Sequence, residues 1–193
     1  MNLKKIITIL GMTCFLQGCI FVVGAAAGAA AIAIVYDHRP IESTLEDTKI
    51  ANQIVDNIHT IPALRNESHI DVTVFNHIVL LTGETPSQEW REQAEDIAKS
   101  TPTVSRVYNQ IAIQGPTSSL TRTSDSWITT KIKSQMLASE ELKTNNSSIK
   151  VVTENGVVYL MGNVTQQQAS TAVEIARQVS GVQKVIKIFQ YKN

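Results

Sequence analysis

Apolar residues recur along this chain at two spacings, and the same order of spacings occurs twice. Each half opens with apolar residues at helical spacing: Ile50, Ile54 and Ile58 in the first half, and Ile128, Ile132 and Met136 in the second. A spacing of three to four residues places these side chains on one face of a helix. The pattern predicts an amphipathic helix at the start of each half.

Two short runs rich in β-branched residues follow each predicted helix. They cover residues 70–74 and 78–81 in the first half, and 149–152 and 157–160 in the second. Asn155-Gly156 connects the second pair and favours a type I′ hairpin turn. Asn76-His77 stands in the first connection, where the His77 side chain tolerates a positive φ poorly. We therefore expect a looser turn, or one of another type, in the first half.

A second helix is predicted after each hairpin. Thr85 and Thr165 each precede a glutamine by three residues, the pattern of a helix N-cap with a residue that reaches back to it. Apolar residues then share one helix face, with Trp90 among them. We interpret these faces as core, Trp90 included.

Each half ends in a third predicted strand, at residues 104–113 and 182–191. The order helix, strand, strand, helix, strand predicts an α+β fold. Each unit should contain a three-stranded mixed sheet with two helices on one of its faces.

The sequence of the hairpin itself repeats. Residues 78–83 return 79 positions later as residues 157–162, which indicates a small domain present in two copies. We divide the chain into a signal peptide (1–18), a tether (19–45), a first domain (46–114), a linker (115–124) and a second domain (125–193). The linker begins with the turn-forming residues Gly115 and Pro116.

The N-terminus is typical of an export signal, with Lys4 and Lys5 before an apolar run from Ile6 to Phe15. The string from Leu16 to Cys19 resembles the lipobox of bacterial lipoproteins. That resemblance implies cleavage before Cys19 and a lipid chain on its sulfur.

An uncleaved transmembrane helix is the alternative, because apolar residues continue from Ile20 to Val35. A helix of that length reaches about 24 Å, whereas the hydrocarbon core of a bilayer is roughly 30 Å thick. A lipid anchor is therefore favoured. Ile20 stands where enteric lipoproteins retained in the inner membrane carry Asp, which implies the outer membrane, facing the periplasm. Cys14 would leave with the signal, so no internal disulfide is expected.

The chain resembles a known domain family at two motifs. One is Val-x-Leu-x-Gly, present at Val79 and again at Val158, and the other is Val-x-x-Val-x-Asn, which begins at Val104. Both are similar to the BON domain. Two such domains behind a lipobox resemble the dual-BON outer-membrane lipoproteins of the DolP type. The resemblance implies a non-enzymatic protein that binds anionic phospholipid through the first helix of its second BON domain.

The residues give no indication of catalysis. The four histidines, at positions 38, 59, 69 and 77, lack the spacing of a metal site, and no nucleophile motif or phosphate loop occurs. We expect no enzyme activity, metal or cofactor. Nucleic acid is excluded as a partner by the compartment and by the absence of a strongly basic face.

Charge differs between the two copies. From Asp47 to Ile113 there are nine acidic and five basic residues, for a net charge of −4, whereas Asp125 to Lys192 has five acidic and eight basic, for +3. An anionic surface should therefore attract the second copy.

On a helical wheel, Trp127 points about 140° away from the core side of its helix, towards Lys131 and Leu137. Lys133 lies at the border of that outer half. We predict that Trp127, Lys131, Lys133 and Leu137 bind anionic phospholipids such as cardiolipin or phosphatidylglycerol. The alternative is that Trp127 packs against the first domain or the linker.

The expected function is support of envelope integrity, with division sites rich in anionic lipid as an expected location. The rival hypothesis is an adaptor that docks an envelope protein, such as a cell-wall hydrolase regulator or a component of the outer-membrane assembly machinery.

Overall fold

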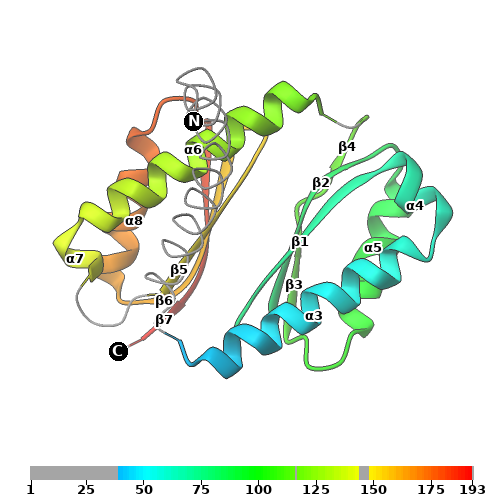
Figure 1. Ribbon diagram of the computed structural model, residues 1–193, viewed down its shortest axis with the longest axis horizontal. Helices are drawn as coiled ribbons and strands as arrows, with labels where there is room; N and C mark the ends of the chain where they lie inside the picture. The colour runs from blue at the N-terminus through cyan, green and yellow to red at the C-terminus, as the bar shows by residue number, and fades with distance from the viewer. Residues whose placement is uncertain (1–38, 116, 144–147, 193) are drawn as a thin grey trace, which may run out of the picture. The chain divides into compact units, whose positions relative to one another are not determined.

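The computed structural model describes residues 39–115, 117–143 and 148–192 (Figure 1). The predicted signal peptide 1–18, the lipidation site Cys19 and most of the predicted tether lie outside the described residues. Within the described ranges, no helix is both long enough and apolar enough to cross a membrane.

The first domain contains seven elements around a sheet in which β2 is central. They are α3 (Ile41–His59), α4 (Pro62–Glu67), β1 (His69–Phe75), β2 (Ile78–Thr85), α5 (Gln88–Ser100), β3 (Arg106–Asn109) and β4 (Ala112–Ile113). β1 pairs antiparallel with β2, and β3 and β4 pair parallel with it. The predicted mixed sheet is therefore confirmed.

The second domain repeats this order with an unbroken last strand. Its elements are α6 (Ser119–Ala138), α7 (Glu140–Lys143), β5 (Ser148–Glu154), β6 (Val157–Val164), α8 (Gln166–Gln178) and β7 (Lys184–Tyr191). The strand order is β5-β6-β7, antiparallel and then parallel. The helices α4 and α7 were not predicted, because six and four residues are too few to establish a helical period.

In each domain the two long helices cover one face of the sheet (Figure 1). The predicted apolar stripes form these cores: Ile50, Ile54 and Ile58 are buried under the first sheet, and Ile128, Ile132 and Met136 are buried in the second domain. Trp90 packs at the edge of the first core, as expected. Burial of these stripes drives the docking of helix on sheet.

The sheet faces that the helices leave uncovered pack against each other. Phe75, Ile78 and Leu80 of the first domain form one buried cluster with residues of the second: Tyr159, Met161 and Ile188. Polar contacts accompany it, from Asn76 Nδ2 to Gln190 Oε1 (2.6 Å) and from Lys150 Nζ to Val74 O (2.8 Å). Residues 39–193 thus form a single compact unit, and β2 is buried along its whole length.

The first hairpin turn corrects our expectation. Asn76 and His77 both have positive φ, 50° and 65°, close to the 50° and 74° of Asn155 and Gly156. The two turns have the same left-handed backbone, so the prediction of a different turn was wrong. The reason is tertiary: the Asp47 carboxylate accepts hydrogen bonds from both turn amides, Asn76 N (2.8 Å) and His77 N (3.1 Å).

The predicted helix caps were right in one copy and wrong in the other. Thr165 caps α8 in a complete capping box with Gln168. In the first copy Thr85 is instead the buried last residue of β2, and Ser87 caps α5 by accepting a hydrogen bond from Trp90 N. Either residue has a suitable hydroxyl, but Thr85 corresponds to Val164, the last residue of β6, so in both copies the cap follows the end of the strand.

The last strand of the first domain is interrupted at Asn109, the asparagine of the Val-x-x-Val-x-Asn motif. Its Oδ1 accepts from Ile111 N, and its Nδ2 donates to Arg91 O and to Glu95 Oε2 on α5. This asparagine therefore lies where the strand breaks between β3 and β4, and it ties that point to α5. Lys187 stands 78 positions later, and β7 is continuous there.

Candidate functional site

α6 is the helix that carries the predicted site, and its buried side is the one predicted. Ile128, Ile132 and Met136 are each at most 2% exposed and face the second sheet. The helix begins at Ser119, six residues before our predicted start and within the segment 115–124 that we assigned to the linker. Ser118 is its N-cap and accepts a hydrogen bond from Thr121 N.

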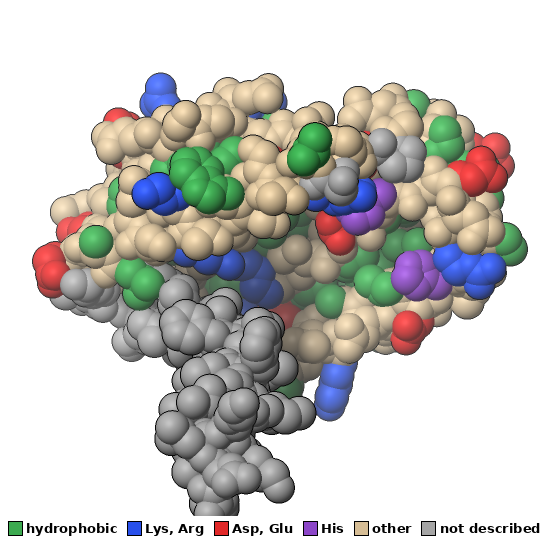
Figure 2. All heavy atoms as spheres, turned by 45° about the horizontal axis from the view of Figure 1, so that its top comes forward, with side chains coloured by type: hydrophobic (Ala, Val, Ile, Leu, Met, Phe, Trp, Pro, Cys, Tyr) green, Lys and Arg blue, Asp and Glu red, His purple; other side chains and the backbone are tan. Residues whose placement is uncertain are grey.

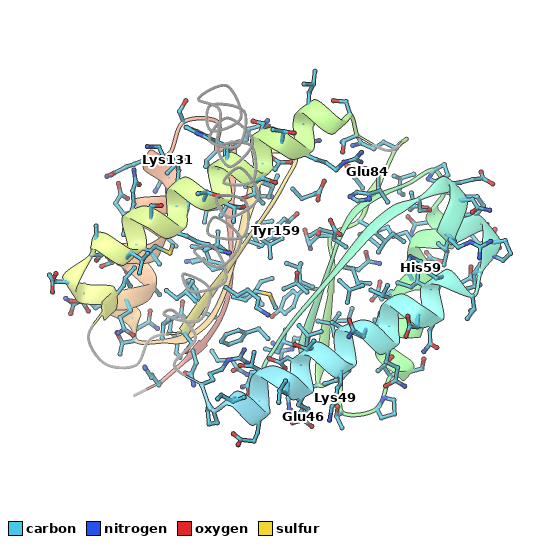
Figure 3. All side chains as sticks on the ribbon, viewed as in Figure 1. Glu46, Lys49, His59, Glu84, Lys131 and Tyr159 are labelled. Atoms are coloured by element: carbon cyan, nitrogen blue, oxygen red, sulfur yellow. The ribbon has the colours of Figure 1, made fainter. Side chains whose placement is uncertain are left out.

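Trp127 lies on the opposite side of α6 and is 51% exposed. It is not buried between the domains, whose contact is made by the sheet faces. Lys131 follows one turn later, with its Nζ 5.9 Å from the centre of the indole ring, a cation–π distance. The structure therefore brings Trp127 and Lys131 together on an exposed helix face (Lys131 is labelled in Figure 3).

Lys133 and Leu137 are less accessible than Trp127. Leu137 is half-buried. Lys133 lines a hollow of about 340 Å³ that also contains Asp47, Thr48 and Lys150. Burial lowers the pKa of the Lys133 ammonium group. Its side chain thus lies at the boundary with the first domain, on a different side of α6 from Trp127.

Leu120 is a site candidate that the sequence prediction missed. It is 81% exposed and lies seven residues before Trp127, so two helical turns place both on the same face. Leu120 lies ahead of the predicted start at Asp125 and therefore outside the predicted helix. The signal available was Ser118, a good N-cap residue just ahead of Leu120.

The matching face of the first domain differs in chemistry. Lys49 is the counterpart of Trp127 and is also exposed. Glu46 lies one helical turn before it on α3 (Figure 3). Glu46 Oε2 lies 3.3 Å from His77 Nε2. A large exposed aromatic group beside a lysine is therefore a feature of α6 and not of α3.

Space-filling representation shows how these groups meet the surface. In Figure 2, where α6 comes forward, apolar side chains stand among basic and uncharged polar groups rather than in one continuous apolar patch. In the described ranges, no three His, Cys, Asp or Glu residues are grouped so that they could hold a metal ion.

Comparisons with known proteins agree on one family. The model of the BON domain matches residues 46–115 and 124–193. The chain is 36% identical over 189 residues to the outer membrane lipoprotein DolP of Haemophilus influenzae, covering 98% of this chain and 96% of that protein. It is 37% identical over 161 residues to a 21 kDa hemolysin of Actinobacillus pleuropneumoniae, covering 80% and 82%.

Among solved structures, the C-terminal domain of CdsD, a structural protein of the type III secretion system of Chlamydia trachomatis, aligns over 76% of this chain and 67% of that chain. The TM-score is 0.29 and the identity 14%.

Proposed function

Because this chain belongs to the BON-domain family, and within it to the dual-BON outer-membrane lipoproteins, we propose that α6 binds anionic phospholipid at the membrane surface. In this proposal the protein is not an enzyme. A lipid on Cys19 anchors it to the periplasmic face of the outer membrane, and α6 determines where on that membrane it gathers. Its role is then to support envelope integrity, including at division sites.

The exposure of Trp127 beside Lys131 is the observation that carries the proposal. An indole ring is favoured at the boundary between lipid headgroups and water. A nearby ammonium group contributes about 1 kcal/mol at an anionic surface. Leu120 extends the same face by two turns, so a helix lying along the surface presents apolar groups at both points. Such a face suits an interfacial helix, which lies on the membrane without crossing it.

Within the proposed site the four predicted residues have different weights. Trp127 and Lys131 are exposed and adjacent, so they carry most of the binding. Leu137 is half-buried and adds apolar contact when α6 binds to the membrane surface. Lys133, with its lowered pKa and its place at the boundary with the first domain, contributes least.

Vesicle co-sedimentation tests the site. Residues 39–193 form a compact unit without the predicted anchor, so any binding must come from the folded part. We expect them to sediment with vesicles containing phosphatidylglycerol or cardiolipin, and less with purely zwitterionic vesicles. Trp127→Glu should abolish binding, and Lys131→Gln should weaken it about fivefold, the equivalent of about 1 kcal/mol. Raising the salt concentration should weaken binding further.

Tyr191 supplies a matched control, since it is an aromatic residue 49% exposed on β7. Tyr191→Glu introduces the same charge at similar exposure, and should leave binding unchanged. Equal sedimentation of Trp127→Glu and the unsubstituted unit would contradict the assigned site. An equal loss in Tyr191→Glu would mean that any added negative charge is enough.

The second candidate function is a periplasmic adaptor for an envelope protein, and the same exposed Trp127 supports it. A photo-crosslinking residue at position 127 distinguishes the two in cells. Crosslinks to lipid alone favour the membrane proposal, whereas a defined protein adduct lost on Lys131→Gln favours the adaptor.

A further inference from the structure

The interface between the two domains has an acidic end. Glu84, the residue before the last of β2, is 1% exposed, and Glu154 ends β5 of the other domain (Glu84 is labelled in Figure 3). Glu84 is paired with His69 across the sheet, so its side chain lies on the sheet face where His69 and Glu154 line one hollow, and the two carboxyl groups interact there. Glu84 Oε2 also accepts a hydrogen bond from Thr117 N at 3.2 Å. Glu154 Oε1 is enclosed and has no donor among the described residues, as expected if the missing proton lies between the two carboxyl groups.

The surroundings add negative charge to the pair. Glu154 lines a hollow of about 440 Å³ together with other charged groups: His69 and Asp71 on β1, and Arg122 and Asp125 on α6. The charges of Glu84, Asp71 and Asp125 all act on Glu154, and Glu154 in turn acts on Tyr159 of β6.

Two of these groups are already engaged with other partners. Asp125 accepts from the amides of Asn155 (2.8 Å) and Gly156 (2.9 Å). Asp71 Oδ2 lies 3.4 Å from His69 Nε2. The turn that precedes β6 therefore holds the Asp125 carboxylate in the hollow that Glu154 also lines.

Burial is the largest cause that raises the pKa of Glu154, to about 7, followed by the charge of Glu84. A carboxyl group with such a pKa keeps its proton in mildly acidic solution and can donate it to a neighbouring carboxylate. One proton held between the two carboxyl groups gives each of them a hydrogen-bonded oxygen.

We propose that Glu84 and Glu154 share one proton and form a carboxyl latch between the two BON domains, closed in mildly acidic solution and released as the pH rises. When the proton leaves, two carboxylates face each other in an enclosed site beside Asp71, and their repulsion acts across the interface. Each domain has its own helix-covered core, so the repulsion separates the two sheet faces before it unfolds either domain.

The latch also lies close to the proposed membrane site. Asp125 faces Glu154 and stands two residues before Trp127 on α6. The latch does not require lipid binding, however, and can be tested with no membrane present.

Spin labels report the opening directly. Residues 39–193 contain no cysteine, so Asn66→Cys and Ser170→Cys place one label on an exposed position of each domain. We expect a single narrow distance at pH 5 and an added broad, longer component at pH 8.5, measured by electron–electron double resonance. The ratio of separated to closed molecules should rise by about one to two orders of magnitude over this range.

Substitutions then assign the response to the latch. Glu154→Gln should stay closed at both pH values, because its amide donates to Glu84 without a titrating proton. Glu84→Gln should behave in the same way. Glu174→Gln removes an exposed carboxylate from α8 of the same domain and should keep the full response. His69→Gln should also keep it, and it removes the imidazole that lies beside Asp71 in the same hollow.

A titration of the unsubstituted protein gives an independent answer. Carboxyl ¹³C resonances followed by NMR should show Glu154 titrating near pH 7, well above an ordinary glutamate. A measured pKa in the ordinary glutamate range for both Glu84 and Glu154 would overturn the proposal. So would a pH response that survives in Glu154→Gln, or one that disappears in His69→Gln while Glu154→Gln retains it.

Discussion

At the scale of single residues, one aspartate in each domain does more than contribute charge. Asp47 and Asp125 occupy the same position on the first helix of their copies, and both are buried. Each carboxylate accepts hydrogen bonds from two successive amides of its hairpin turn. The bonds hold a left-handed turn in place even where His77 stands instead of glycine. The sequence shows the aspartates, but only the fold brings each of them to a turn about 30 residues away.

Removing one of these carboxylates should destabilise its domain. Asp125→Ala leaves the amides of Asn155 and Gly156 without an acceptor in a largely buried place. We expect the free energy of unfolding in urea to fall by about 2–3 kcal/mol. Asp125→Asn keeps one acceptor oxygen and should lose less. A loss below about 0.5 kcal/mol for Asp125→Ala would show that the turn is held by its own backbone preference.

The core glycine of each hairpin is fixed by close contact. A Cβ on Gly83 would lie 2.0 Å from the carbonyl oxygen of His69, and a Cβ on Gly162 would lie 2.6 Å from that of Ser148. The repeated Val-x-Leu-x-Gly motif therefore reflects the close approach of two strands at one point. It is a structural motif and says little about function.

At the scale of elements, the sequence predicted the long helices and the strands and missed the short connections. Three apolar positions at a regular spacing define the first helix of each domain, whereas α4 and α7 are too short for any period to be recognised. The start of α6 was placed too late because Leu120 and Thr121 do not continue the buried stripe of Ile128 and Ile132. The first residue of a helix depends on which residue is its N-cap, and several residues with a hydroxyl group near each helix start could take that position.

Substitution of the N-cap residues tests how much each cap stabilises its helix. Thr165→Ala breaks the capping box of α8, and Ser87→Ala removes the side-chain acceptor at the start of α5. Each should lower the free energy of unfolding by about 1 kcal/mol in urea or thermal denaturation. Ser170→Ala, in the interior of α8, is the control and should be neutral or slightly stabilising. A loss as large for Ser170→Ala as for Thr165→Ala would argue against a capping role.

At the scale of the whole molecule, two similar domains meet through the sheet faces that their helices leave open. The interface is apolar at one end, around Phe75 and Met161, and acidic at the other, around Glu84 and Glu154. The same pairing leaves the outer face of α6 in solvent, with Trp127 exposed. The domain contact and the proposed membrane contact thus use different surfaces, so neither has to be broken for the other to form.

Stability should depend on pH in a defined direction. The folded pKa of Glu154, about 7, lies above its ordinary value of 4.5, so the folded protein holds more protons between these values. The contribution of Glu154 to the free energy of unfolding is therefore greatest at and below about pH 4.5. It falls as the pH rises to about 7. For a half-buried group, screened by solvent, we expect a loss of about 1–2 kcal/mol between pH 5 and 8.

Urea unfolding of the unsubstituted unit and of Glu154→Gln, at both pH values, isolates this contribution. The pKa of Glu95 is lowered, because Lys99 and Asn109 hydrogen-bond to its carboxylate. The contribution of Glu95 to stability therefore changes only at pH values below the ordinary pKa of a glutamate. It does not interfere in the window from pH 5 to 8. Identical pH profiles for the two proteins would exclude a contribution from Glu154.

The sequence by itself determined the local and repeated features of this protein: two copies, the order of long elements, and which helix faces are buried. These features can be read from the spacing of apolar residues and from the repeated sequence, because both patterns involve residues close together in the chain. Only the tertiary structure decided that the open sheet faces meet, that Trp127 stays in solvent, that Lys133 is half-buried, and that Glu84 lies beside Glu154. Such pairings join residues far apart in the chain, and no local pattern encodes which distant side chain will be the neighbour.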